Sequence, residues 1–309
     1  MLSPVWIAVL LSGSFLLLLF GVNVPHEYLS QPANPGIHID ESHPNLDGVT
    51  DLILYTYHET DEAFKNLDFF LRHALHDKAD FVFVMNGEYT ISIPDLPNIK
   101  VIDRPNTCYD LGAYGEVLRA DDSLLATKYS RFIMINASLR GPFFPAWANN
   151  CWSDTYLSKL SDHVKLVGMT YNCAQGMSYL PHLQSMIMAT DRLGMAAILP
   201  NLKCFENMGS AVADGETQIS RWIQEAGYGI YAMMSSFTAY GGEESEKVYL
   251  EACSGSDALY SGKHNGTSLH PYDTIFSKTN RPWNEYDRKV IDQLTEYAHL
   301  SGYSSYDKC

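Results

Sequence analysis

The residues best suited to chemistry lie in short polar segments that follow apolar stretches of the chain. In the segment RPNTCYDLGAY (104–114), Asn106 and Asp110 are polar, and Gly112 allows a ligand to approach the backbone closely. A helix that starts here would direct its free N–H groups outward, an arrangement that favours phosphate. The alternative interpretation is an ordinary turn in which Asp110 only caps the helix.

A second polar segment, NASLRGPF (136–143), also follows an apolar stretch. Asn136 and Ser138 offer polar atoms that can bind a diphosphate or a metal ion. Arg140 can neutralise phosphate charge through two parallel hydrogen bonds. The alternative is a polar turn before Gly141-Pro142 without any ligand.

Two carboxylates lie close together in the segment Asp214-Gly215-Glu216-Thr217, at the expected start of a helix that ends near Ala226. A carboxylate that is fixed on a rigid element beside a cleft can act as a general base. Carboxylates at helix starts also serve simply as caps, because the helix dipole stabilises them there. Glu216 and Asp214 are therefore candidate catalytic residues with a structural alternative.

His270 lies before Pro271, which favours an extended backbone at His270. Imidazole is a common metal ligand, so His270 is a candidate metal ligand; the alternative is a surface histidine. The P-loop, H-E-x-x-H, G-x-S-x-G and G-x-G-x-x-G motifs are absent. The sequence thus gives no support for a dinucleotide cofactor or a nucleophilic hydrolase.

The polar segments are separated by alternating strand-like and helix-like stretches. Apolar runs predict strands at 52–57, 79–85, 99–102, 131–135, 164–170 and 184–190. Helical spacing of apolar residues, including Phe64, Leu67, Leu71 and Ala74, predicts helices after residue 61 and over 114–125, 191–198, 215–226 and 284–300. This alternation is typical of an α/β fold with a largely parallel sheet and helices on both faces. Ligands bind such sheets beyond the carboxyl ends of the strands, where the polar segments fall.

The N-terminal segment differs from the rest of the chain. Residues 5–22 contain no charged side chain, and roughly 18 apolar residues are enough to cross a bilayer. We therefore expect residues 1–24 to form an uncleaved signal anchor, a transmembrane helix; a cleaved signal peptide or a buried helix is the alternative. Residues 25–48, rich in proline and glycine, are expected to form a stem. Residues 49–309 then form a single lumenal domain.

Charge and cysteine content agree with this setting. The formal net charge of −15 argues against a nucleic-acid partner, because phosphate would be repelled. The six cysteines suit an oxidising lumen, and their fifteen possible pairings stay open at this point. Asn265-Gly266-Thr267 is an acceptor sequence for N-glycosylation.

Taken in order, several of these stretches resemble uncharacterised eukaryotic Golgi-type glycosyltransferases. The core Asn-x-x-x-Asp-x-Gly-Ala that starts at Asn106 is more distantly similar to bacterial rhamnan-synthesis glycosyltransferases. The resemblance lies in RPNTCYDLGAYGEVL (104–118), FIMINASLRGPFFPAW (132–147), VKLVGMTYNC (164–173), PHLQSMIMATD (181–191) and HPYDTIFSKTNR (270–281).

The resemblance implies a GT-A-like fold, with a Rossmann-like mixed sheet flanked by helices, and a nucleotide-sugar donor. It also implies transfer to a glycan or glycoprotein acceptor, in the Golgi or endoplasmic reticulum membrane or, alternatively, by a secreted protein. Families of this fold usually carry an Asp-x-Asp motif that binds Mn²⁺ or Mg²⁺. Here Asn136-Ala137-Ser138 replaces it, which puts metal dependence in doubt because hard divalent cations prefer carboxylates. Either Arg140 or Lys278 can offset the diphosphate charge instead, or a metal can bind through phosphate oxygens and His270.

The resemblance also implies roles for the other candidate residues. Glu216 matches the general base of inverting enzymes, and Asp214 competes for that role. Asn106, Asp110 and Gly112 would line the donor site.

Two rival functions follow from the same residues. One is a relative without catalytic activity that binds a glycan or a nucleotide, as the missing Asp-x-Asp suggests. The other is a glycan hydrolase, which needs two facing carboxylates; Asp110 and Glu216 are the candidate pair.

Overall fold

The computed structural model describes most of the chain beyond residue 50. The chain divides into two units, Met1–His38 and Ile39–Cys309, and every described residue belongs to the second. The predicted signal anchor (1–24) and stem (25–48) lie outside the described residues. Among the described residues, no helix combines the length and apolar character needed to cross a membrane. The described ranges are 51–120, 129–173, 180–239, 245–253, 257–281 and 284–309.

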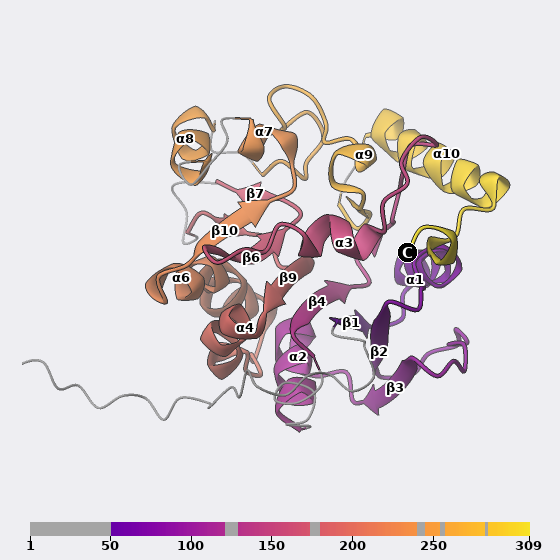
Figure 1. Ribbon diagram of the computed structural model, residues 1–309, viewed down its shortest axis with the longest axis horizontal. Coiled ribbons are helices and arrows are strands. Elements are labelled where there is room, and N and C mark those ends of the chain that lie inside the picture. The colour runs from indigo at the N-terminus through magenta and orange to yellow at the C-terminus, as the bar shows by residue number, and fades with distance from the viewer. Residues whose placement is uncertain (1–50, 121–128, 174–179, 240–244, 254–256, 282–283) are drawn as a thin grey trace, which may run out of the picture. The chain divides into compact units, whose positions relative to one another are not determined.

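A seven-stranded mixed sheet with the order β10-β6-β9-β4-β1-β2-β3 forms the centre of the second unit (Figure 1). Strand β1 is parallel to β2 and β4, β2 is parallel to β3, and β6 is parallel to β10. Strand β9 is antiparallel to both of its neighbours, β4 and β6. The expectation of a largely parallel sheet is confirmed. The strands are β1 (Asp51–Tyr57), β2 (Ala79–Asn86), β3 (Ile99–Arg104), β4 (Arg131–Asn136), β6 (Val164–Gly168), β9 (Ile187–Asp191) and β10 (Gly229–Ala232).

The strand order reverses between β1 and β4. From β1 the chain proceeds outward through β2 to β3 on one side, and it then returns to place β4 on the other side of β1. In the register of the pair, Thr56 near the end of β1 lies opposite Asn136, the last residue of β4. A crevice at the carboxyl ends of two such strands is the usual ligand site in open α/β sheets.

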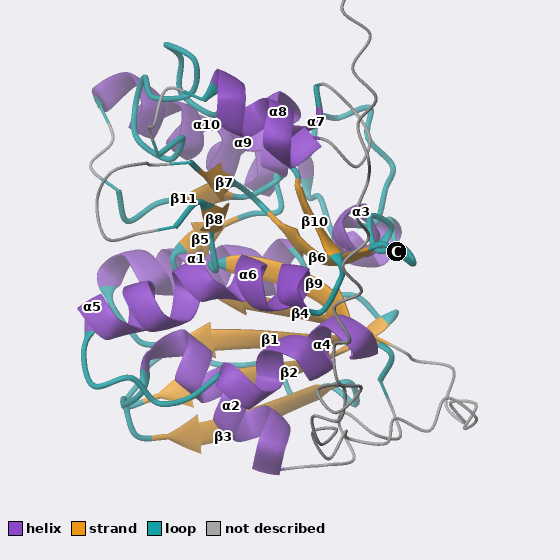
Figure 2. Cartoon of the chain, turned by 90° about the vertical axis from the view of Figure 1, so that its left-hand side faces the viewer, coloured by secondary structure: helices purple, strands orange, loops and turns teal. Residues whose placement is uncertain are grey.

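Helices cover both faces of the sheet, as the alternation of elements predicted. Helices α2, α4 and α6 lie on one face, and α1 and α3 lie on the other (Figures 1 and 2). The C-terminal helix α10 packs on α1 through the apolar cluster of Phe69, Phe143, Ile291 and Leu294. The main helices are α1 (Asp61–His73), α2 (Tyr109–Ala120), α3 (Trp152–Leu157), α4 (Arg192–Ile198), α6 (Thr217–Glu225) and α10 (Glu285–Ser301).

Shorter elements connect these layers. Strand β5 pairs antiparallel with β11, and β7 pairs antiparallel with β8. These elements are β5 (Leu139–Arg140), β7 (Tyr171–Asn172), β8 (His182–Leu183), β11 (Ser277–Lys278), η2 (Leu199–Asn201), α5 (Met208–Ser210), η3 (Ala211–Glu216), α7 (Ser235–Thr238), α8 (Ser245–Ala252), α9 (Pro271–Thr274) and η4 (Ser305–Asp307).

Two predicted helix starts were wrong, and both errors fall beside the candidate site. Helix α2 starts at Tyr109 instead of residue 114, so Asp110 and Gly112 belong to its first turn. The second helical segment starts at Met208 instead of residue 215, because Asn207 caps it by accepting a hydrogen bond from the backbone N–H of Ser210 at 3.0 Å. Glu216 is therefore not at a free helix start.

The six cysteines form three disulfides, Cys108–Cys204, Cys151–Cys309 and Cys173–Cys253. The first joins the turn before α2 to the segment after η2. The second ties the C-terminus to the residue before α3. Each disulfide closes a loop of 80 residues or more, so the three together restrict the unfolded chain strongly.

Candidate functional site

A cavity of about 480 Å³ opens at the carboxyl ends of β1, β2 and β4, at the reversal of the strand order. Several separate parts of the chain bring polar side chains to it. The predicted site residues that line it are Asn106, Asp110, Asn136, Ser138, Glu216 and Lys278. Sequence reasoning placed these residues in different loops, and the fold brings them together.

A chain of hydrogen bonds crosses the floor of this cavity. Asn136 donates from Nδ2 to Oδ2 of Asp110 at 2.6 Å, and its Oδ1 accepts from Ser138 Oγ at 2.6 Å. Lys278 Nζ in turn donates to Ser138 Oγ at 3.0 Å. The Asn136-Ala137-Ser138 segment therefore links a carboxylate on one side to an ammonium on the other.

The environment shifts the pKa values of Asp110 and Lys278, the two groups at the ends of this series of hydrogen bonds. Burial raises the pKa of the Asp110 carboxyl, and the nearby Glu216 carboxylate adds to this, while hydrogen bonds from Asn136 and the Leu111 backbone oppose it. Burial also lowers the pKa of the Lys278 ammonium, against the attraction of Glu216 and Asp110. The cavity thus holds its charges in a partly desolvated setting, where electrostatic interactions are stronger than in water.

The turn that presents Asp110 has an unusual backbone. Cys108 and Tyr109 have φ values of 71° and 52°, a left-handed conformation that is uncommon outside glycine. The disulfide to Cys204 holds this turn in place. Strained backbone of this kind is found preferentially at functional sites.

Gly112 does not line the cavity and instead allows α2 to pack closely. A Cβ atom at this position would lie 2.7 Å from the Cβ of Cys108 and 3.1 Å from the carbonyl oxygen of Lys203. Gly112 therefore supports the turn that carries Asp110.

Arg140 lies behind the cavity and not among its lining residues. Its guanidinium donates to Glu62 Oε1 at 2.7 Å and to Asn66 Oδ1 at 3.0 Å, and its side chain is 6% exposed. Arg140 is thus engaged by the protein itself, and the structure does not bring it to the position expected of a diphosphate ligand.

Asn66 is a buried positioning residue that sequence reasoning missed. From α1 it donates to the carbonyl oxygen of Ala137 at 2.9 Å and to Thr279 Oγ1 at 2.8 Å. It therefore ties the loop after β4 to Thr279, the residue that follows Lys278 at the end of β11. A polar residue on the mostly apolar buried face of α1 was the signal in the sequence.

Glu216 reaches the cavity from η3, a π-helical segment within one continuous helical stretch. Its Oε1 accepts hydrogen bonds from the backbone N–H of Ser185 at 2.8 Å and from Ser185 Oγ at 3.0 Å. Oε2 accepts none from the described part of the chain. Ser185 thus orients the carboxylate through one oxygen and leaves the other for a ligand. Wide π-helical turns of this kind occur frequently at functional sites.

Asp214 is exposed on the same segment and does not line the cavity. The two candidate bases are therefore separated by the structure, and only Glu216 is placed where it can meet a ligand in the cavity.

A corner with uncharged polar groups lies at the ends of β1, β2 and β3. His58 Nδ1 is 3.0 Å from the carbonyl oxygen of Asn86, and His58 Nε2 is 3.2 Å from Asn106 Nδ2. In the neutral tautomer that fits both contacts, Nδ1 donates and Nε2 accepts. Arg104 braces this corner by donating from Nη1 to Asn86 Oδ1 at 2.5 Å. His58 and Asn86 were missed in the sequence, although a polar residue that ends an apolar strand is a usable signal.

His270 lies away from this cavity. It is the N-cap of α9, where its Nδ1 accepts a hydrogen bond from the Tyr272 backbone N–H at 3.2 Å, and it lines a separate pocket with Asn284 and Tyr286. The structure does not bring it together with Asn136, Ser138 or Glu216.

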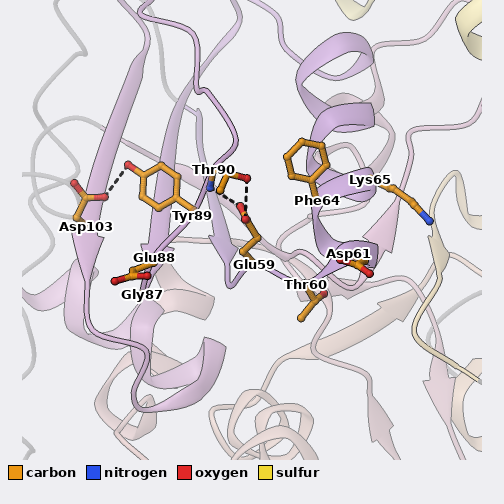
Figure 3. Close-up of a pocket in the computed structure, with 10 residues that line it drawn as sticks. All are labelled: Glu59, Thr60, Asp61, Phe64, Lys65, Gly87, Glu88, Tyr89, Thr90 and Asp103. Atoms are coloured by element: carbon orange, nitrogen blue, oxygen red, sulfur yellow. Dashed lines mark hydrogen bonds between the residues drawn. The ribbon is translucent and has the colours of Figure 1, made fainter.

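A wider groove of about 1270 Å³ lies between α1 and the segment after β2 (Figure 3). Four carboxylates line it, at Glu59, Asp61, Glu88 and Asp103, with the single cation Lys65 among its described residues. Local hydrogen bonds occupy two of the carboxylates: Thr90 donates to Glu59, and the Tyr89 hydroxyl donates to Asp103 at 3.0 Å. The groove contains none of the predicted site residues.

Comparison with known proteins gives structural similarities only. No protein-family model matches the sequence, and no curated protein matches it. Among solved structures, the chain is similar to the mannosyltransferase PcManGT from Pyrobaculum calidifontis, in complex with GDP-Man and Mn²⁺ (14% identity, 59% of this chain, 54% of that chain, TM-score 0.37). It is also similar to the glycosyltransferase GlyE of Streptococcus pneumoniae (10% identity, 80% of this chain, 60% of that chain, TM-score 0.40) and to the apo form of GlyE (10%, 83%, 65%, TM-score 0.41).

These structural neighbours are glycosyltransferases, and the chain spans about half to two thirds of their length. TM-scores at this level carry no argument about the activity of this protein. The functional conclusion is therefore built on the geometry of the cavity.

Proposed function

We propose that this protein is a glycosyltransferase that moves a sugar from a nucleotide-sugar donor to a glycan or glycoprotein acceptor. The observation that carries the proposal is the convergence of Asn106, Asp110, Asn136, Ser138, Glu216 and Lys278 on one cavity at the strand reversal. Such a crevice suits a nucleotide, and this one combines neutral polar groups, one cation and one carboxylate with an available oxygen.

The cavity divides into regions that match the parts of such a donor. His58, Asn86 and Asn106 offer neutral donors and acceptors suited to a nucleoside. Ser138 and Lys278 offer a hydroxyl and an ammonium suited to the diphosphate. The sugar would then lie between the diphosphate and Glu216.

The chemistry assigned to Glu216 is general-base catalysis with inversion at the anomeric carbon. An acceptor hydroxyl oxygen attacks the anomeric carbon of the donor sugar. The bond between that carbon and the donor phosphate oxygen breaks, and the nucleoside diphosphate leaves with the bonding electrons. The hydroxyl proton passes to Oε2 of Glu216. Ser185 keeps the carboxylate oriented through Oε1, so the base is preorganised for this step.

The proposed setting is the secretory pathway. Three disulfides favour an oxidising compartment. The sequence Asn265-Gly266-Thr267 lies in an exposed turn, as an N-glycosylation site requires. We place the protein in the Golgi or endoplasmic reticulum membrane through residues 5–22, with secretion as the alternative.

The contacts of Asp110 argue against the hydrolase alternative. A glycosidase needs one carboxyl group that donates a proton to the leaving oxygen. Both oxygens of Asp110 accept hydrogen bonds from N–H groups, of Leu111 at 2.9 Å and of Asn136 at 2.6 Å. These contacts hold Asp110 as an acceptor.

The test is a turnover assay of the full-length protein with a panel of nucleotide sugars and mixed glycan acceptors, with Mn²⁺ and separately with EDTA. We expect release of a nucleoside diphosphate that depends on both donor and acceptor, and NMR of the product should show an inverted anomeric configuration. Nucleotide binding without turnover would instead support the relative without catalytic activity. Release of free sugar from a glycan without any donor would support the hydrolase.

A further inference from the structure

The Asn136-Ala137-Ser138 segment contacts a cation that belongs to the protein. Ser138 Oγ accepts a hydrogen bond from Lys278 Nζ at 3.0 Å and donates one to Asn136 Oδ1 at 2.6 Å. Of the described residues that line the cavity, Lys278 is the only lysine or arginine. The ammonium thus lies against the third residue of the segment that replaces Asp-x-Asp.

Backbone pairing fixes this ammonium in place. Lys278 lies opposite Leu139 in the antiparallel pair of β11 and β5, and the Thr279 N–H donates to the Ser138 carbonyl at 2.9 Å. Asn66 donates hydrogen bonds to Ala137, two residues before β5, and to Thr279, directly after β11. The contact between Lys278 and Ser138 therefore comes from the fold and not from a mobile surface side chain.

The same residues do not suit a divalent metal ion. Mn²⁺ and Mg²⁺ prefer carboxylate oxygens, and the segment offers an amide and a hydroxyl. A divalent ion bound there would also lie beside an ammonium, and the repulsion in a partly desolvated cavity is strong. Both oxygens of Asp110 already accept hydrogen bonds from N–H donors.

The described residues hold one cluster of three potential metal ligands, and it lies elsewhere. It consists of His76, Cys151 and Cys309, whose two cysteines are joined in a disulfide and so cannot act as thiolate ligands.

We propose that Lys278, held by Ser138, takes the place of the divalent metal in binding the donor diphosphate, so that the protein binds its nucleotide without a metal. The inference rests on the proposed function and names how the same site recognises its donor. An ammonium binds phosphate oxygens as a point charge and needs no fixed coordination geometry. The neighbouring cation Arg140 is committed to Glu62, so Lys278 supplies the positive charge at the cavity.

The charge balance of the cavity makes the effect of Lys278 large. Asp110, Glu216 and Glu62 also line it, and Glu62 is paired with Arg140, so an incoming diphosphate meets two carboxylates without such a pairing and one ammonium. Removal of the ammonium leaves only the carboxylates facing the phosphate. Charge-assisted hydrogen bonds of this kind change affinity by about tenfold to a hundredfold.

The experiment is calorimetric titration of the full-length protein with UDP, GDP and dTDP, in EDTA and in MnCl₂. We expect one of these nucleotides to bind with the same affinity, within about threefold, in both conditions. Lys278→Met should weaken that binding in EDTA by about tenfold or more, and Lys278→Arg should retain most of it. The matched control is Lys289→Met, which removes the same charge from an exposed position on α10 away from the cavity and should bind as the wild type does.

Two results would overturn the inference while leaving the proposed function intact: nucleotide binding by the wild type only with Mn²⁺, or undiminished binding by Lys278→Met. The first comparison needs no substitution, so it decides the question even where a variant fails to fold. Binding of none of the three nucleotides in either condition would overturn the proposed function itself.

Discussion

The cavity at the strand ends and the acidic groove beside it are built in different ways. Cavity contacts join residues that are far apart in the sequence, with separations of 213 residues for Asn66 and Thr279 and 140 for Ser138 and Lys278. Groove contacts are more local, with separations of 14 residues for Tyr89 and Asp103 and 31 for Glu59 and Thr90. The residues that line the larger groove are thus joined mainly by local contacts, and those that line the smaller cavity are joined by contacts of long range.

The difference shows why volume is a poor guide to function here. The groove is the wider hollow, but four carboxylates line it, and an anionic ligand would be repelled. The smaller cavity combines a cation, an oriented carboxylate and neutral amides, each held by contacts from another element. Such preorganisation is what binding and catalysis require of a site.

The largest effect is expected for the catalytic carboxylate of the cavity. Glu216→Gln removes the base but keeps an oxygen that can accept from Ser185, so turnover should fall by about a thousandfold while nucleotide affinity changes little. Steady-state rates together with calorimetric titration separate the two effects. Asp214→Asn, on the same segment but exposed, is the matched control and should retain full turnover. Equal losses in both variants would mean that the cavity has been assigned the wrong base.

A smaller but measurable effect is expected in stability. Asn66→Ala removes the buried hydrogen bonds to the carbonyl of Ala137 and the hydroxyl of Thr279, together with one partner of the Arg140 guanidinium, which keeps Glu62. The free energy of unfolding should therefore fall by about 3 kcal/mol. Urea denaturation measures the change. Thr90→Ala in the groove breaks one exposed hydrogen bond to Glu59 and should change stability far less. A loss of similar size in the two variants would contradict the difference between the two regions.

The sequence predicted the sheet better than it predicted the site. Apolar runs revealed strands such as 52–57 and 131–135, because strands buried on both faces are continuously apolar. It also identified six cavity residues, since polar groups after strand ends meet at one edge of a parallel sheet. The sequence also suggested Arg140 and His270 as ligands, and the structure places both outside the cavity lining. Charge and residue type do not reveal local partners such as Glu62 or the α9 backbone.

Contacts between residues far apart in the sequence explain why the start of α2 and the burial of Asn66 were not predicted. Cys108, the residue before the start of α2 at Tyr109, forms a disulfide to Cys204, 96 residues away, and local propensity contains no sign of this contact. The apolar face expected for α1 included Phe64, which is 39% exposed, and left out Asn66, which is fully buried by partners from β11 and the loop after β4. Tertiary contacts overrode helical spacing at both positions.

The pH dependence of stability offers a finer test of the cavity. Burial and the Glu216 carboxylate raise the pKa of Asp110 in the folded protein, against Lys278 and Asn136. Because the pKa of Asp110 is higher in the folded state than in the unfolded state, this group favours folding at low pH, and the advantage is lost as pH rises through the folded pKa. Stability of the wild type should therefore fall relative to Asp110→Asn as pH rises from about 4, the pKa of an unfolded aspartate, towards neutral.

Urea denaturation of both proteins at several pH values measures this dependence. Any effect of Asp110→Asn that does not depend on pH cancels in the comparison between pH values. A difference that stays constant with pH would mean that the pKa of Asp110 is the same in the folded and unfolded states, and one that changes in favour of the wild type would mean that the carboxylate is stabilised in the cavity.

The smallest effect is expected from the groove. Glu88→Gln removes one exposed carboxylate that lines the groove, and its only influence on a nucleotide in the cavity is through solvent. Screening by salt limits such an interaction to a short range, so UDP, GDP or dTDP affinity should rise by less than about twofold, and less at high salt than at low salt. Calorimetric titration at two salt concentrations measures this. A tenfold change in either direction would mean that the groove contacts the nucleotide, and the donor site would then have to extend across Thr60, the residue that lines both hollows.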